Sequence, residues 1–163
     1  MSLVAPIIPE FKHEAEVTRR VLERVPNDMG TWKPHEKSFP LAHLAQLVAW
    51  MPGWIANALT ETELDFKTAP KYSIEKTETL LALFDENVKA AMAALAKAKD
   101  EDLGVMWALK NNGQVLFSMP RGVIVRQNIS HLVHHRAQLG LYLRLLDLPV
   151  PSMYGPTADE RTF

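Results

Sequence analysis

Hydrophobic positions recur at helical spacing along four long segments of the chain. In the first segment, Phe11, Ala15, Thr18 and Leu22 follow one another every three or four residues, which is the period of an amphipathic helix. The second segment is apolar on nearly all sides, as is typical of a helix buried between others. The pattern predicts helices over about 10–25, 41–59, 74–98 and 120–146.

The segments between these helices are long and rich in turn residues. Asn112 and Gly113 stand between two short apolar runs, and this pair is typical of a tight hairpin turn. Because both runs are short, we interpret the region as an irregular excursion and expect no sheet of consequence. Long helices joined by loops of about ten residues or more predict an all-α fold, a four-helix bundle with long connections. We expect a single domain over 1–163, with the proline-rich tail 149–163 docked on the bundle.

Composition excludes several classes of function. Lys and Arg number 18 against 19 Asp and Glu, so the formal charge is −1 and there is no basic excess of the kind that nucleic acid or an anionic membrane attracts. The absence of cysteine excludes disulfides, thiolate metal sites and a cysteine nucleophile. The beginning of the chain does not resemble a signal peptide, and no apolar run approaches the ~20 residues of a membrane span. We therefore expect a cytoplasmic protein with no membrane partner.

The fourth predicted helix carries a cluster of histidines on its apolar face. His131 and His135 lie four residues apart, so their side chains share one face of the helix about 6 Å apart. That spacing lets two imidazoles chelate one divalent ion. His134 lies about 60° away around the helix. The alternative is a buried histidine pair that only hydrogen-bonds to its neighbours. Residues that share this face and could line or support a metal site are Asn128, Gln138 and Tyr142.

The stretch HLVHHRAQLGLYLRLLDLPVPSMYGPTADE resembles the end of the DinB/YfiT-like metalloenzyme family, whose signature is H-x-x-x-H-R-x-Q. VLERVPNDMGTWKPHEKS is similar to the first helix and following loop of the family, and LAQLVAWMPGW to its second helix. The resemblance covers nearly the whole chain. It implies a four-helix bundle, a homodimer, and a divalent metal, zinc or nickel, held by three histidines.

Carried over to this chain, the resemblance implies that His131 and His135 are the two metal ligands of the fourth helix. The third ligand of the family falls on Leu47, which cannot bind a metal. His43 lies on the same face, one helical turn or about 6 Å earlier. Two interpretations stay open: either His43 takes the third place, giving a site of His131, His135 and His43, or the site has two histidines.

The resemblance also implies a class of chemistry. Relatives include thiol-dependent isomerases and S-transferases that use low-molecular-weight thiols, so one hypothesis is a metal-dependent hydrolase or thiol transferase acting on a small molecule. The other hypothesis is a degenerate family member, a dimeric binding or scaffold protein that has lost its ion, and Leu47 favours it. Arg136, which follows the signature histidine, points away from the ligands, and we expect it to pair with a carboxylate or to contact a dimer partner. The strongly apolar second helix favours a dimer in either case.

Overall fold

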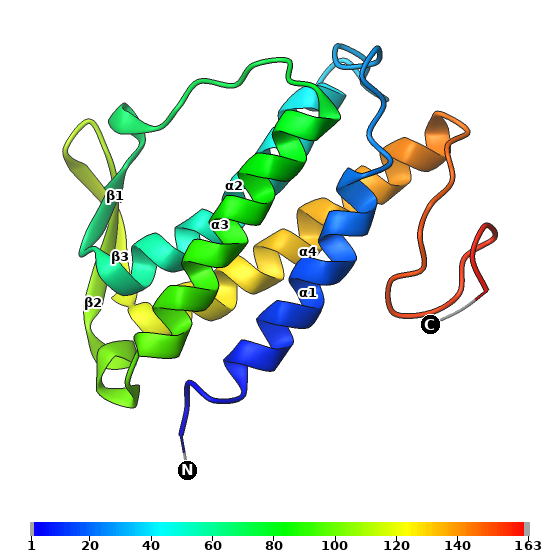
Figure 1. Cartoon of the computed structure of the whole chain (residues 1–163). Coiled ribbons are helices and arrows are strands. Elements are labelled where there is room, and N and C mark those ends of the chain that lie inside the picture. Colours follow the sequence, from blue (N-terminus) through cyan, green and yellow to red (C-terminus); the bar gives the residue numbers. More distant parts are fainter. Residues whose placement is uncertain (1, 162–163) are drawn as a thin grey trace.

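The computed structural model, which describes residues 2–161, contains four long helices. Figure 1 shows them packed side by side, with the sheet at one end of the bundle and the C-terminal tail at the other. All four predicted helices are present, with ends displaced by a few residues. Their bounds are α1 Ile7–Leu22, α2 Leu41–Thr60, α3 Thr77–Lys97 and α4 Arg121–Leu145.

Helix α2 is the most buried of the four, because it packs mainly against α3 and α4. It runs unbroken through Pro52, and the next residue, Gly53, lets α3 come close. A Cβ at Gly53 would lie 2.7 Å from the Asn87 side-chain oxygen. The Asn87 amide in turn donates a 2.9 Å hydrogen bond to the carbonyl oxygen of Ala49. The apolar surface of α2 is thus covered by this chain's own helices.

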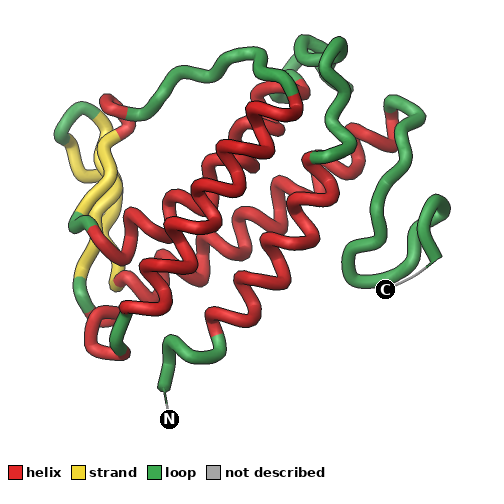
Figure 2. Tube along the Cα trace, in the orientation of Figure 1, coloured by secondary structure: helices red, strands yellow, loops and turns green. Residues whose placement is uncertain are grey.

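The expected all-α fold was wrong, because the molecule also contains a three-stranded mixed sheet (Figure 2). β1 pairs in parallel with β2, and β2 pairs antiparallel with β3. Asn112 and Gly113 form the turn between β2 and β3 with φ angles of 51° and 78°, the left-handed conformation that tight hairpins require. The turn signal was therefore correct, but its flanking runs were wrongly dismissed as too short. The strands are β1 Glu63–Asp65, β2 Met106–Asn111 and β3 Gln114–Pro120.

One side chain attaches this sheet to α2, and another fixes the turn of its hairpin. Trp107 of β2 is buried, and its indole nitrogen donates a 3.0 Å hydrogen bond to the Asn57 side-chain oxygen on α2. Asp65 accepts hydrogen bonds from the backbone nitrogens of Lys67, Asn112 and Gly113, at 2.9, 2.9 and 2.7 Å. These bonds lower the pKa of the Asp65 carboxyl group, and the bond from Lys67 has the largest effect. The hairpin tip is thereby fixed beside the short 3-10 helix η1, Phe66–Thr68.

The tail after α4 lies against α1 and α4. Arg20 of α1 donates a 3.0 Å hydrogen bond to the carbonyl oxygen of Ser152, and its guanidinium also pairs with Glu160. Within the tail, the Asp159 carboxylate accepts a 2.9 Å hydrogen bond from the backbone nitrogen of Val150. The last two residues of the predicted tail, 162–163, lie outside the described residues.

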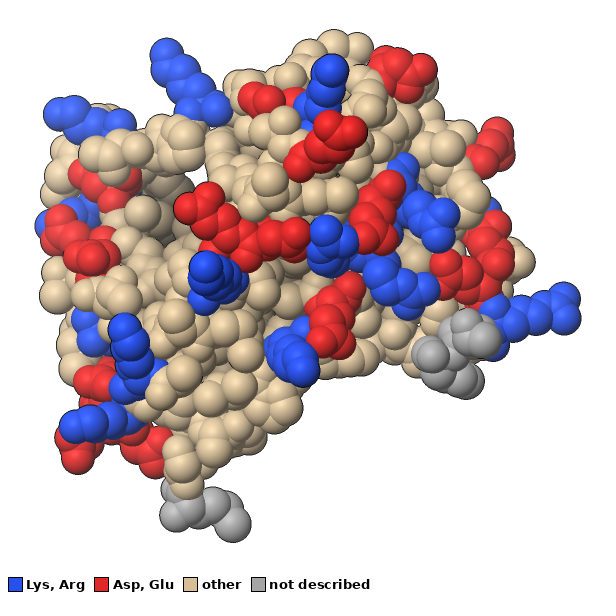
Figure 3. All heavy atoms as spheres, viewed as in Figure 1, with Lys and Arg blue, Asp and Glu red and all other residues tan. Residues whose placement is uncertain are grey.

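Figure 3 shows acidic and basic side chains interspersed over the face it presents. Several of them form ion pairs between elements, such as Arg19 of α1 with Asp85 of α3 and Arg126 of α4 with Glu10 of α1. This mixture agrees with the balanced charge of the sequence. None of the described helices is both long enough and apolar enough to traverse a bilayer.

Candidate functional site

Helix α4 brings the two predicted histidines together. The Nε2 atoms of His131 and His135 lie 2.9 Å apart, and the ring centroids are separated by 4.6 Å. Both side chains are half-buried and line the same cavity. Their spacing of four residues places them on successive turns, so no loop has to be ordered to form the pair.

Gln138 holds the ring of His135 in a defined orientation. The His135 Nδ1 atom lies 2.7 Å from the Gln138 Oε1 atom, and the Gln138 amide nitrogen lies 3.2 Å from Nε2 of His134. Since the amide oxygen can only accept, this pattern assigns the proton of neutral His135 to Nδ1. The lone pair of its Nε2 therefore accepts a 2.9 Å hydrogen bond from the protonated Nε2 atom of His131. Gln138 thus takes the supporting role that a ligating histidine requires.

Both imidazoles favour the neutral form. Burial is the main cause that lowers the pKa of His131, and the neighbouring charges of His135 and His134 lower it further. Burial also dominates the lowering of the pKa of His135, although its hydrogen bond with Gln138 acts in the opposite direction. The neutral imidazole is the form that binds a metal ion, and a bound ion would replace the hydrogen bond of the pair, with the His131 proton moved to Nδ1.

His43 is not brought to this pair. Its ring stacks on Phe39, at 4.3 Å between centroids and 22° between planes, and lies 3.5 Å from the ring centroid of Tyr72. It borders a separate small hollow. Leu47, by contrast, lines the same cavity as the histidine pair. Across residues 2–161, no group of three or more His, Cys, Asp or Glu side chains is gathered to hold a metal ion. A ligand role for His43 stays a prediction.

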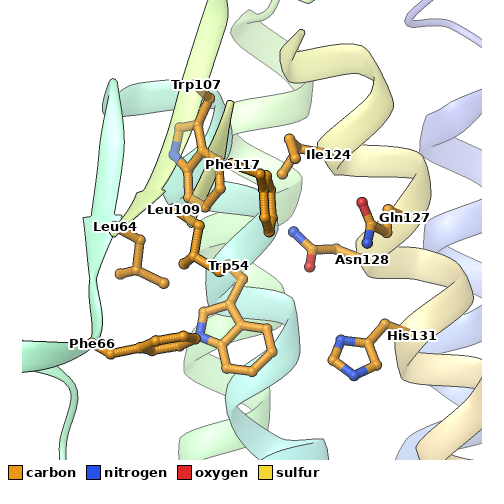
Figure 4. A pocket seen from close by; sticks show the side chains of 10 residues that line it. All are labelled: Trp54, Leu64, Phe66, Trp107, Leu109, Phe117, Ile124, Gln127, Asn128 and His131. Atoms are coloured by element: carbon orange, nitrogen blue, oxygen red, sulfur yellow. The ribbon is translucent and has the colours of Figure 1, made fainter. Parts of the chain in front are cut away.

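The histidine pair opens into two adjoining hollows. The larger has a volume of about 720 Å³ and lies among α2, α3, α4 and the segment 66–72. The smaller has a volume of about 210 Å³ and lies between α2, α4 and the sheet (Figure 4). His131 and Trp54 border both hollows, with their rings 6.0 Å apart and nearly parallel, at 29°.

The sheet supplies cavity walls that we did not expect from the sequence. Leu64, Trp107, Leu109 and Phe117 all face the smaller hollow (Figure 4), and Phe66 of η1 joins them. A signal for this was present, because the two large side chains of Trp107 and Leu109 are two residues apart and would share one face of a strand. The parallel partner strand β1, distant in sequence, carries no such signal.

Arg136 pairs with a carboxylate, which was one of the two roles expected of it. Its side chain is 1% exposed, and its Nη1 atom lies 2.6 Å from an oxygen of Glu14 on α1. The Tyr154 hydroxyl group lies 2.8 Å from the same carboxylate oxygen and 2.7 Å from Nη2 of Arg136. This network, in which Arg136 and Glu14 are buried and Tyr154 is exposed, joins α1, α4 and the tail.

Comparison with known proteins places this arrangement in a family. The chain is 23% identical over 154 residues to the uncharacterized protein YrdA of Bacillus subtilis (strain 168), covering 94% of this chain and 89% of that protein. A DinB-like protein from Bacillus cereus superposes with a TM-score of 0.69 at 21% identity, over 91% of this chain and 95% of that one. The DinB-like protein YjoA of Bacillus subtilis superposes with a TM-score of 0.71 at 18% identity, over 96% of this chain and 99% of that one.

The solved structures share the fold, and the family itself is shown by sequence. The DinB family model matches residues 2–162, which confirms the resemblance carried by the H-x-x-x-H-R-x-Q motif. On this evidence the chain belongs to the DinB family.

Proposed function

We propose that this chain is a metal-dependent enzyme that binds one divalent ion through His131 and His135 and acts on a small molecule in the adjoining cavity. The observation that carries the proposal is the convergence of the two Nε2 atoms, 2.9 Å apart, at the wall of that cavity. Two nitrogens bound at right angles, each about 2.0–2.1 Å from a metal, are also about 2.9 Å apart. The donor pair therefore fits two adjacent positions of an octahedral or square-planar ion such as nickel, and a tetrahedral zinc ion would require the two nitrogens to move to about 3.3 Å apart.

The residues of the chain have distinct tasks in this proposal. Gln138 fixes the His135 ring so that its Nε2 atom stays available. The aromatic walls, Trp54 above all, hold the substrate and limit the access of water. A bound divalent ion would supply a Lewis acid, with positions left free for water or substrate. Because the family resemblance includes thiol-dependent S-transferases and isomerases, the reaction that we favour is transfer or addition of a small thiol.

Metal titration tests the proposal. Tag-free protein should bind about one equivalent of Zn²⁺ or Ni²⁺ in calorimetry, and His131→Ala should weaken that binding at least tenfold, since one of the two donors is lost. His134→Ala is the matched control on the same helix, and it should stay close to the wild-type affinity, because His134 is not a ligand in this proposal and does not bond to either ligand nitrogen. Less than a tenth of an equivalent of metal after soaking would refute the proposal.

A second candidate is a binding or scaffold protein that has lost the ion. Leu47 supports it, because this residue stands where the family resemblance implies a third ligand and its side chain borders the same cavity as the pair. This candidate predicts that small molecules bind the cavity equally well with and without metal. A turnover that depends on metal and is abolished by His131→Ala, with the fold intact, would contradict it.

We also propose that the chain forms a homodimer. The apolar surface of α2 no longer argues for this, because α3 and α4 cover it within one chain. The support comes instead from exposed apolar side chains, including Leu141 and Leu145 on α4 and Leu116 on β3, all more than half exposed. Sedimentation equilibrium at micromolar concentration should give twice the mass of 18.4 kDa. A monomer at that concentration would refute the dimer.

A further inference from the structure

The smaller hollow has the shape and chemistry of a binding site for one aromatic ring. Its walls are formed by Trp54, Phe66, Trp107 and Phe117, together with aliphatic side chains from β1, β2 and α4 (Figure 4). Its volume is about 210 Å³. An engineered apolar cavity of about 150 Å³ in another protein is large enough for benzene. The hollow can therefore hold a ring with one small substituent.

The amide and imidazole groups that line this hollow, those of Gln127, Asn128 and His131, all come from α4. Figure 4 shows the Asn128 amide pointing from α4 into the space between Phe117 and His131. Asn128 and His131 are three residues apart, so their side chains are neighbours on the helix. Within the described part of the chain, the Asn128 amide makes no side-chain hydrogen bond, so both its donor and its acceptor are free for a ligand.

Neither hollow is lined by a Lys, Arg, Asp or Glu side chain among the described residues. In the protein without metal, a charged group on a ligand would therefore lose its hydration without gaining an ionic partner, which is unfavourable. A neutral carbonyl or amide could instead exchange hydrogen bonds with Asn128, at little loss. The walls thus discriminate by charge as well as by shape.

We propose that the smaller hollow binds an uncharged ligand with a single aromatic ring, whose polar substituent lies between Asn128 and His131. This inference deepens the proposed function, because it names the substrate class of the same site and places the polar substituent next to the histidine pair. Binding of the ring itself needs no metal, so the two proposals can fail separately.

Three probes of the same shape and different charge test the inference. Benzamide, benzoate and benzamidine are titrated calorimetrically at pH 7.5 into the full chain, with and without Zn²⁺. In the titrations without metal, benzamide should bind, and benzoate and benzamidine should bind at least tenfold more weakly, because each carries a charge that finds no partner among the protein side chains. Equal binding of benzoate and benzamide, or no binding of benzamide up to 10 mM (roughly the weakest affinity such a small ligand should show), would overturn the inference.

Two variants and one control locate the site. Leu109→Trp fills the hollow and should abolish benzamide binding, while Val115→Trp on the same hairpin, outside the hollow and 53% exposed, should leave it unchanged. Asn128→Leu should weaken benzamide at least fivefold and leave toluene unaffected, because only the polar contact is lost. If Leu109→Trp does not fold, the test rests on Asn128→Leu and its affinities for benzamide and toluene. A loss of affinity that is equal for benzamide and toluene would overturn the inference.

The metal isotherm separates this inference from the proposed function. Leu109→Trp should keep the wild-type affinity for Zn²⁺, because the histidine pair lies on α4 and is not part of the sheet. Benzamide binding without metal binding would leave the aromatic site standing and refute the proposed function. Metal binding without benzamide binding would refute the aromatic site and leave the proposed function standing.

Discussion

The buried pair of Arg136 and Glu14 makes a quantitative prediction about stability. The Arg136 side chain is 1% exposed and that of Glu14 is 9% exposed, so both charges are nearly removed from water. Arg136→Met would leave the Glu14 carboxylate with the Tyr154 hydroxyl group as its remaining partner in this network. Breaking a buried ion pair on one side typically destabilises a protein by about 3–5 kcal/mol, and we expect a loss in that range.

A second variant separates the ion pair from the packing around it. Arg136 Nε is buried without a hydrogen-bond partner among the described residues, so the pair is not fully satisfied. Replacing both charges, in Glu14→Leu/Arg136→Met, should therefore be less destabilising than Arg136→Met alone, within about 2 kcal/mol of wild type. Urea unfolding followed by circular dichroism gives each free energy of unfolding. The reasoning is refuted if Arg136→Met loses less than about 1 kcal/mol or the double variant is the less stable of the two.

Three further predictions concern the site and the sheet. The pKa values of His131 and His135 are lowered in the folded protein, so as the pH falls these two residues take up protons in the unfolded state before they do so in the folded state. The free energy of unfolding should therefore fall as the pH drops below about 6.5, and a double His→Leu variant should lack part of that slope in urea titrations at several pH values; an unchanged slope would contradict this. Gly113→Val should lower the free energy of unfolding by about 1 kcal/mol or more, because φ is +78° at this position and a side chain there is strained although the surroundings are open. An unchanged midpoint of thermal unfolding would argue against this strain. Leu47→His should raise the calorimetric affinity for Zn²⁺ at least tenfold by adding a third imidazole beside the cavity; no gain would mean that position 47 does not face the ion.

Local periodicity predicted the helices and the histidine pair well, for one physical reason. Positions four residues apart on a helix are neighbours whatever the rest of the fold does, so the closeness of His131 and His135 needed only α4 to be a helix. The apolar face of α1 followed from its spacing in the same way. The pairing of Arg136 with a carboxylate was expected, but its partner on a distant helix could not be named from the sequence.

Contacts between distant segments are what the sequence did not reveal. β1 is a strand because Glu63 pairs with Ala108 and its neighbours follow in parallel, which three residues cannot signal by themselves. The walls of the smaller hollow depend on that sheet, so the roles of Leu64 and Phe117 were missed with it. The prediction placed His43 near the two ligands because it lies one helical turn before Leu47. Its ring instead stacks on Phe39, which lies in the loop before α2, and the sequence does not reveal the course of that loop.

The central claim is that the Nε2 atoms of His131 and His135 face one another across a single ion site. Long-range ¹H–¹⁵N correlation spectra of the histidine rings, recorded during a Zn²⁺ titration at pH 7.5, test it most directly. Without metal, His135 should show a protonated Nδ1 atom, as its bond with Gln138 requires. On addition of zinc, the Nε2 resonances of both rings should shift together and saturate near one equivalent. Shifts confined to the exposed His13 and His35, with the pair unchanged, would contradict the account.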